Sequence, residues 1–170
     1  MQYIQTVPLA IWATAVAYFD ICYRRIPNIL SLGACAVGLV VLGLRGASLT
    51  GAAPSSTAWA FLLGVALTLP AYITKRLGAG DVKYFAAIAL LTSFQVTLTS
   101  FIVTGLVGGL LAAIWLWLPG ILLGSIGDRP LPGRTYLVAW AQIPLQSRRM
   151  AYGALMTIGL FSGLWMEQQS

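Results

Sequence analysis

The chain contains six long apolar stretches, and a backbone that lies in lipid must satisfy its hydrogen bonds within the protein. Helices meet this condition, whereas a barrel would need short segments of alternating hydrophobicity that the sequence lacks. Only 8% of the 170 residues are charged, against roughly 25% in a soluble domain. We therefore predict an all-α polytopic membrane protein with one domain over residues 1–170. The six predicted transmembrane helices are residues 3–19, 29–44, 57–74, 82–91, 96–118 and 150–165.

The fourth stretch is the shortest. About ten residues rise only ~15 Å as a helix, which is half of the ~30 Å hydrocarbon core. A helix this short crosses only if the loop before it already lies at membrane depth, buried in protein or lining a wet cavity. We therefore expect residues 77–81, Leu-Gly-Ala-Gly-Asp, to form such a loop. Gly78 and Gly80 would allow positive φ angles and the close approach of another backbone there.

The basic residues predict the orientation. With the N-terminus outside, nine of the ten fall in inner loops, as expected for a protein whose cytoplasmic loops are positive. Both termini are then outside, and the net charge of +6 needs no nucleic acid as a partner. The first stretch has no basic residues before it, so it is expected to be an anchor and not a cleaved signal peptide. The nine residues are Arg24, Arg25, Lys75, Arg76, Lys83, Arg129, Arg134, Arg148 and Arg149; the tenth is Arg45.

Two features of the composition restrict the chemistry. The absence of histidine excludes Ser-His and Cys-His relays and every His-ligated metal site. Cys22 and Cys35 form no Cys-x-x-Cys pair, so a structural zinc site is not expected either. We predict neither a metal nor an organic cofactor. The acids available for proton transfer are Asp20, Asp81, Asp128 and Glu167.

Asp20 and Asp81 are the candidates for catalysis. The predicted topology places Asp20 at the end of the first helix and Asp81 at the start of the fourth, both at the cytoplasmic face. An acid beside a membrane span is costly and therefore a functional candidate, although an ion pair with Arg24, Arg25 or Lys83 is the structural alternative. Two neighbouring carboxylates share one proton near neutral pH, so one can take a proton from water while the other donates to a carbonyl oxygen. This pair predicts peptide hydrolysis.

The helix ends suggest how the two roles are divided. A helix N-terminus favours an anion and a C-terminus disfavours one. Asp81, at the predicted start of a helix, is therefore assigned as the base, and Asp20, at the predicted end of one, as the acid.

Three segments resemble a known family. Residues 78–83, Gly-Ala-Gly-Asp-Val-Lys, are similar to the Gly-x-Gly-Asp motif of membrane aspartic proteases in its prepilin-peptidase form. Asp20 followed by residues 24–28, Arg-Arg-Ile-Pro-Asn, resembles the first-aspartate motif of type IV prepilin peptidases. Residues 143–144, Ile-Pro, followed by 151–154, Ala-Tyr-Gly-Ala, look like the start of that family's last helix. The resemblance covers nearly the whole chain in the order and spacing of these segments.

The resemblance implies a transmembrane peptidase domain that cleaves the short basic leader of prepilins and pseudopilins at the cytoplasmic face of the bacterial inner membrane. Because the chain begins directly at its first helix, it resembles the short branch found in tight-adherence (Flp) pilus systems, which is expected to lack N-methyltransferase activity. The partners implied are these substrates and the lipid bilayer. The site residues implied are the catalytic Asp20 and Asp81, the loop residues Gly78, Gly80 and Lys83, and the supporting Arg24, Arg25, Pro27 and Asn28.

Two other functions fit the same composition. One is a small proton-coupled transporter whose aspartates relay protons, and the other is a non-catalytic membrane scaffold in pilus assembly. Two observations disfavour the transporter. Both aspartates are predicted at one face of the membrane and not at its midplane, and the sequence lacks paired half-repeats.

Smaller features predict local structure. Asn28 is expected to cap the second helix after Pro27. Lys83 either tunes the charge of the aspartate pair or anchors a loop at the inner face. Gly105 and Gly109 have the Gly-x-x-x-Gly spacing that usually serves close helix packing, with a contact between two copies in a homo-oligomer as the alternative.

Overall fold

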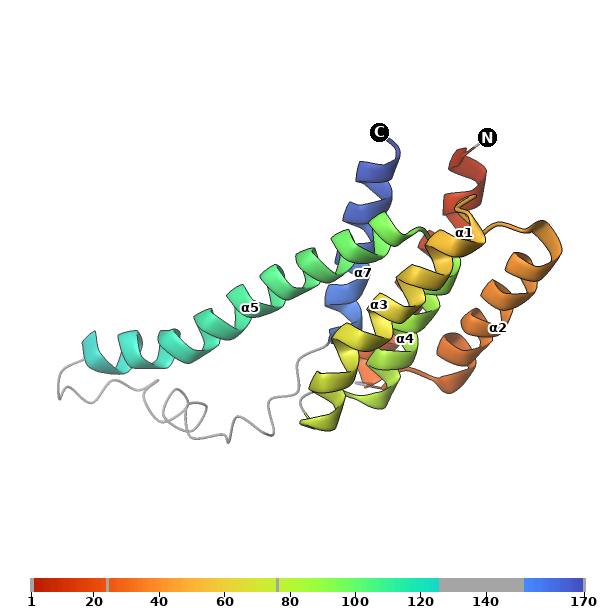
Figure 1. The fold of residues 1–170 in the computed structure, drawn as a ribbon. Coiled ribbons are helices and arrows are strands. Elements are labelled where there is room, and N and C mark those ends of the chain that lie inside the picture. The colour runs from red at the N-terminus through yellow and green to blue at the C-terminus, as the bar shows by residue number, and fades with distance from the viewer. Residues whose placement is uncertain (1, 24, 76, 126–151, 170) are drawn as a thin grey trace. The chain divides into compact units, whose positions relative to one another are not determined.

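The computed structural model describes residues 2–23, 25–75, 77–125 and 152–169. Within these ranges the regular structure is entirely helical, as predicted (Figure 1). Helix α4 begins earlier than expected and α5 extends further at both ends. The helices are α1 (Gln2–Tyr23), α2 (Asn28–Arg45), α3 (Pro54–Ile73), α4 (Ala79–Leu91), α5 (Phe94–Ser125) and α7 (Tyr152–Glu167).

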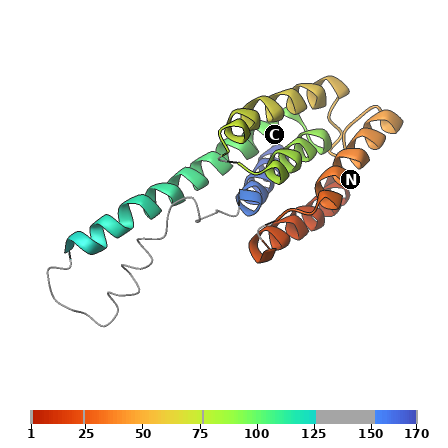
Figure 2. The same ribbon diagram turned by 90° about the horizontal axis from the view of Figure 1, so that it is seen from below.

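The chain divides into two compact units. Residues 1–105 and 151–170 form the first unit, which contains both candidate aspartates, and residues 106–150 form the second. In the first unit α4 packs against α2, α3 and α7, and α7 packs against α1. The end-on view shows α4 next to α2 and α3 (Figure 2). Of the second unit the structure describes residues 106–125, which belong to α5.

Among the residues that the structure describes, four helices are long and apolar enough to cross a membrane: Thr6–Tyr23, Asn28–Arg45, Pro54–Ile73 and Phe94–Ile114. The outer faces of the first three carry large apolar side chains, such as Ile11, Ile29 and Trp59, which are 67%, 86% and 65% exposed. Extensive exposed apolar surface is unfavourable in water but suits contact with lipid. The chain is therefore a membrane protein, and the count of six spans stays a prediction.

Helix α4 has only 13 residues, yet it forms the centre of the first unit. Its residues 84–91 are all buried, with Tyr84 and Phe85 fully so. A helix surrounded by other helices does not have to match the thickness of the bilayer, because protein side chains and not lipid cover it. This explains how so short an apolar helix is accommodated.

The start of α4 differs from the prediction. Residues 79–81 were expected in the loop, but they form the first turn of the helix, with Gly78 as the N-cap. Neither Gly78 nor Gly80 takes a positive φ; the positive φ near this turn belongs to Lys75, at 57°. The connection from α3 therefore turns earlier than expected, and the two glycines serve close contacts, as shown below.

The close packing of α5 and α7 depends on a glycine pair that the sequence analysis did not single out. Gly159 and Gly163 of α7 have the Gly-x-x-x-Gly spacing and lie against α5. A Cβ at Gly163 would lie 2.9 Å from the carbonyl oxygen of Val96, and one at Gly159 would collide with that of Ser100. Small residues allow two backbones this close in a membrane protein. In contrast, a Cβ at Gly105 would meet no described atom within 4 Å, so the packing predicted there is not observed.

We predict that Gly159→Ala lowers the free energy of unfolding by about 1–3 kcal/mol, the usual cost of overpacking. The new methyl group meets backbone, which cannot rotate away, so α5 and α7 must separate. Thermal unfolding of the purified protein in detergent measures the effect. Gly43→Ala is the matched control, because a Cβ there meets nothing within 4 Å. Equal melting temperatures for the two variants would show that α5 and α7 are not in close contact.

Candidate active site

Asp20 lies in the last turn of α1 and is only 6% exposed. Its Oδ2 atom accepts a hydrogen bond from the backbone N–H of Ala154, at 3.2 Å, and the N–H of Gly153 is a second donor. Both donors belong to the first turn of α7, where N–H groups have no partner within the helix. The end of α1 is therefore joined to the start of α7 by this carboxylate.

Asp81 is the third residue of α4 and is partly buried. Its Oδ2 atom accepts a hydrogen bond from the N–H of Gly78 at 3.2 Å, while the carbonyl of Gly78 accepts one from the N–H of Asp81 at the same distance. This reciprocal pair closes the N-terminus of the helix. A Cβ at Gly78 would lie 3.0 Å from the Asp81 Oδ2 atom, so the carboxylate reaches back over a residue that has no side chain.

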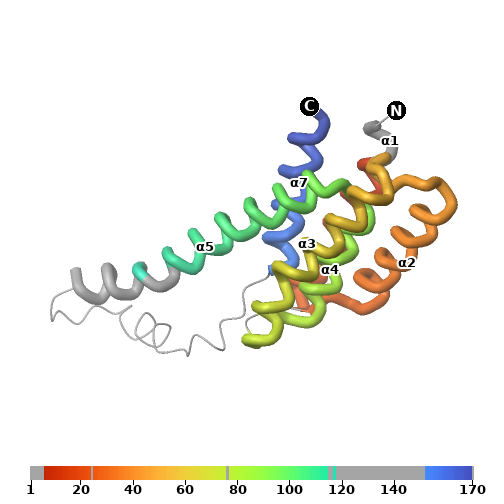
Figure 3. The backbone as a smooth tube through the Cα atoms, in the orientation of Figure 1, coloured from red at the N-terminus to blue at the C-terminus, as the bar shows by residue number. Residues whose placement is uncertain are grey.

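The structure brings the two aspartates into one site. Asp81 experiences the charge of Asp20, and α1 ends where α4 and α7 begin (Figure 3). Ile26, from the loop between α1 and α2, lies between the two helix starts: positions for a Cβ at Gly80 and at Gly153 are 3.4 Å and 3.0 Å from its side chain. Burial and the charge of Asp20 together raise the pKa of Asp81 to about 6, as expected for two carboxylates that interact.

A comparison with known protein families agrees with this geometry. The sequence model of the type IV leader peptidase family matches residues 7–113, which is more than half of the chain and includes both aspartates. The chain belongs to the type IV leader peptidase family. Comparison with curated proteins and with solved structures gave no match.

The helix ends do not separate the roles of the two aspartates in this leader peptidase family member. Asp20 lies at the C-terminus of α1, as predicted. The structure adds the N-terminus of α7, whose N–H groups favour a negative charge there. Both carboxylates thus lie at a helix N-terminus, and the assignment of Asp81 as base and Asp20 as acid loses the argument on which it was based.

The supporting residues behave differently from one another. Lys83 donates a hydrogen bond from Nζ to the Asn28 Oδ1 atom at 3.1 Å, so it connects α4 to the start of α2. The predicted N-cap was wrong: Pro27 is the N-cap of α2, and Asn28 is the first helical residue without a capping bond from its side chain. Its amide oxygen accepts the Lys83 ammonium instead. Arg25 is exposed, and Arg24 lies outside the described residues, as does Asp128.

A buried polar pair near the aspartates, Tyr84 and Thr157, was not predicted from the sequence. Tyr84 lies one turn after Asp81, and its hydroxyl is 2.8 Å from the Thr157 Oγ1 atom. The Thr157 hydroxyl is also within hydrogen-bond distance of the Ala13 and Gly153 carbonyls, at 3.2 and 2.9 Å. These contacts join α1, α4 and α7. The position of Tyr84 relative to Asp81 is visible in the sequence, but nothing there pairs it with a threonine 73 residues away.

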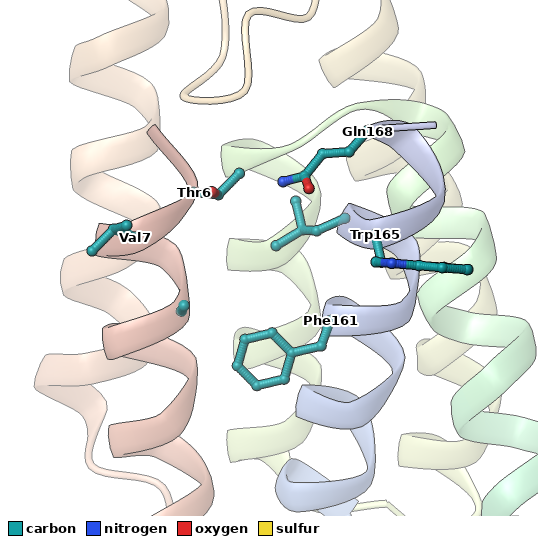
Figure 4. A pocket seen from close by; sticks show the side chains of 7 residues that line it. Thr6, Val7, Phe161, Trp165 and Gln168 are labelled. Carbon is teal, nitrogen blue, oxygen red and sulfur yellow. The ribbon is translucent and has the colours of Figure 1, made fainter. Parts of the chain in front are cut away.

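Other groups lie away from this site. An apolar pocket between α1 and α7 is lined in part by Thr6, Val7, Phe161, Trp165 and Gln168 (Figure 4). The pocket lies at the start of α1 and the end of α7. Asp20 lies at the opposite ends of these helices, in the last turn of α1 and in contact with the first turn of α7. In the part of the chain that the structure describes, no three His, Cys, Asp or Glu side chains gather as they would around a metal ion.

We predict that Tyr84→Phe and Thr157→Val are energetically coupled. Each single change removes the same buried hydrogen bond, so the double variant should lose less stability than the sum of the two. Hydrogen bonds between membrane helices contribute about 0.6 kcal/mol on average and about 1.7 at most. Unfolding of the four proteins in detergent measures the coupling. Strictly additive losses would mean that the two hydroxyls do not interact.

Proposed function

We propose that this chain is a membrane aspartic endopeptidase that removes the N-terminal leader of type IV prepilin-like proteins at the cytoplasmic face of the bacterial inner membrane. Membership of the leader peptidase family supports the class of reaction. The observation that carries the aspartic mechanism is the electrostatic interaction between Asp20 and Asp81 where three helix ends meet. The substrates are prepilins and pseudopilins with short basic leaders.

The proposed mechanism uses the single proton that the pair holds. The ionised aspartate removes a proton from water as its oxygen attacks the scissile carbonyl carbon, and the protonated aspartate donates its proton to the carbonyl oxygen. In the second step a hydroxyl of the tetrahedral intermediate gives its proton to the ionised carboxylate, the protonated carboxyl gives its proton to the leaving nitrogen, and the C–N bond breaks. The pair then holds one proton again. The N–H groups of Gly78 and Ala154 keep the two carboxylates in place.

The remaining difference between the aspartates supports one assignment of roles. Asp20 is buried, whereas Asp81 is partly exposed and therefore closer to solvent. A partly exposed carboxylate is more accessible to water than a buried one. On this ground, and not on the helix ends, we assign Asp81 as the base that activates water and Asp20 as the acid.

Substitution of either aspartate by asparagine tests the mechanism. Asp20→Asn and Asp81→Asn keep the size of the side chain but remove its proton chemistry, so we expect cleavage to fall by at least about 100-fold. A prepilin is co-expressed with each variant, and its shortening is followed on a gel and by mass spectrometry.

Glu167→Gln is the matched control for the loss of an acid. Glu167 accepts a hydrogen bond from the Ser93 hydroxyl near the other end of α4, and glutamine can accept the same bond. This variant should cleave like the wild type. Cleavage at the wild-type rate by either asparagine variant would contradict the aspartic mechanism. A transporter or a scaffold would leave the prepilin uncut even with the wild-type chain.

The same product tests the proposal that this is a peptidase without N-methyltransferase activity. The mass of the new N-terminus should correspond to a free amine when S-adenosylmethionine is supplied. A mass increase equal to one methyl group, dependent on S-adenosylmethionine and on this chain, would contradict the peptidase-only proposal and leave the peptidase proposal intact.

A further inference from the structure

We infer that Gly153 is a positioning residue for the reaction: its missing side chain lets the first turn of α7 hold the Asp20 carboxylate in its working geometry. The inference rests on the proposed function, because it assigns Gly153 a part in the same site. It concerns a residue of the last helix, outside both aspartate motifs and outside residues 7–113 that the family model matches.

The space at Gly153 is already filled by the active site. A Cβ at this position would lie 3.0 Å from the Asp20 Oδ2 atom, 3.1 Å from its Cγ atom and 3.0 Å from the Ile26 Cδ1 atom. These distances are tighter than nine in ten real Cβ contacts. A side chain here therefore requires the carboxylate, Ile26 or α7 to shift by a few tenths of an ångström.

The two aspartates are held in the same way. At Asp81, the Oδ2 atom accepts the Gly78 N–H at 3.2 Å and lies 3.0 Å from the place of a Gly78 Cβ. At Asp20, the Oδ2 atom accepts the Ala154 N–H at 3.2 Å and lies 3.0 Å from the place of a Gly153 Cβ. The first glycine belongs to the Gly-x-Gly-Asp motif. Gly153, from a distant part of the chain, leaves space for the Asp20 carboxylate beside a helix start, as Gly78 does for the Asp81 carboxylate.

The donors at Asp20 are backbone groups of α7. The first turn of a helix has N–H groups without intrahelical partners, and the carboxylate satisfies them. Asp81 and Tyr84, both of α4, also interact electrostatically with Asp20. Because both are acidic groups, they do not stabilise the charged form of Asp20, whereas the N–H groups of α7 do. Moving the carboxylate away from α7 removes this stabilisation.

Gly153→Ala is therefore expected to impair the chemical step more than substrate binding. Displacement of a catalytic group by about 1 Å can cost on the order of 100-fold in rate, so for a shift of a few tenths of an ångström we expect kcat to fall by about 3- to 10-fold. KM should stay within about twofold, because the substrate still binds the same surface. The pH optimum should move upward by about half a unit to one unit, since the charged form of Asp20 loses hydrogen-bond donors.

Three comparisons separate positioning from a general loss of structure. Gly159→Ala changes the same helix but meets α5, so it should lower stability and leave the pH optimum unchanged. Gly43→Ala, in open space, should behave as wild type. Ile26→Val removes the Cδ1 atom, so the double variant Ile26→Val/Gly153→Ala keeps only the collision with Asp20. Its kcat relative to that of Ile26→Val should be as low as that of Gly153→Ala relative to the wild type.

The experiment uses the full-length chain in proteoliposomes and a prepilin with a basic leader, with kcat, KM and the pH profile measured for each folded variant. Wild-type kcat and an unchanged pH optimum in Gly153→Ala would overturn the inference, as would recovery of kcat in the double variant. If Gly153→Ala does not fold, the double variant decides, since its remaining collision is with Asp20. Failure of the wild type to cleave would instead contradict the proposed function.

Discussion

The site depends on the hydrogen bonds between two carboxylates and the N–H groups at the starts of two helices. A charge in an apolar environment is expensive unless it is paired or hydrogen-bonded. Many proteins solve this with a cation, but Lys83, two residues after Asp81, donates its hydrogen bond to Asn28. Asp20 and Asp81 are held by backbone donors, which fix their positions without neutralising them with a full positive charge. A pair held in this way remains free to share a proton, as acid-base catalysis requires.

The position of α4 follows from the same requirement. Asp81 must reach the end of α1, and a helix that is exposed to lipid would have to begin near the membrane surface. Helix α4 avoids this because α2, α3 and α7 surround it, so that its length is not set by the bilayer. Its buried face is continuous, and Tyr84 extends the polar contacts of the site into the core through Thr157. The short helix and the buried carboxylates are therefore two parts of one arrangement.

Much of the helical architecture and the pairing of the aspartates could be predicted from the sequence, because both depend on local signals. Apolar runs determine helices, and Asp20 and Asp81 are the acids that adjoin spans at one predicted face. Some of the wrong predictions are local, such as the loop over residues 79–81, and others concern contacts between distant residues. Asn28 is a good N-cap in isolation, but Pro27 takes that place and Lys83 engages the side chain. Likewise, the Gly-x-x-x-Gly spacing occurs at Gly105 and at Gly159, and only the partner helix decides which pair packs.

The glycines of α7 illustrate why such contacts matter for function. Gly153 faces α1 and the carboxylate, whereas Gly159 and Gly163 face α5 and its backbone carbonyls. One helix therefore carries two kinds of close approach: the first sets the geometry of a reacting group, and the second sets the distance between two helices. A methyl group added at either place removes space, but the consequences differ, because a displaced carboxylate changes the chemical step while a displaced helix changes the free energy of unfolding. Along α7, Gly153 and Gly159 are separated by less than two turns of helix, and Gly163 lies about one turn further on.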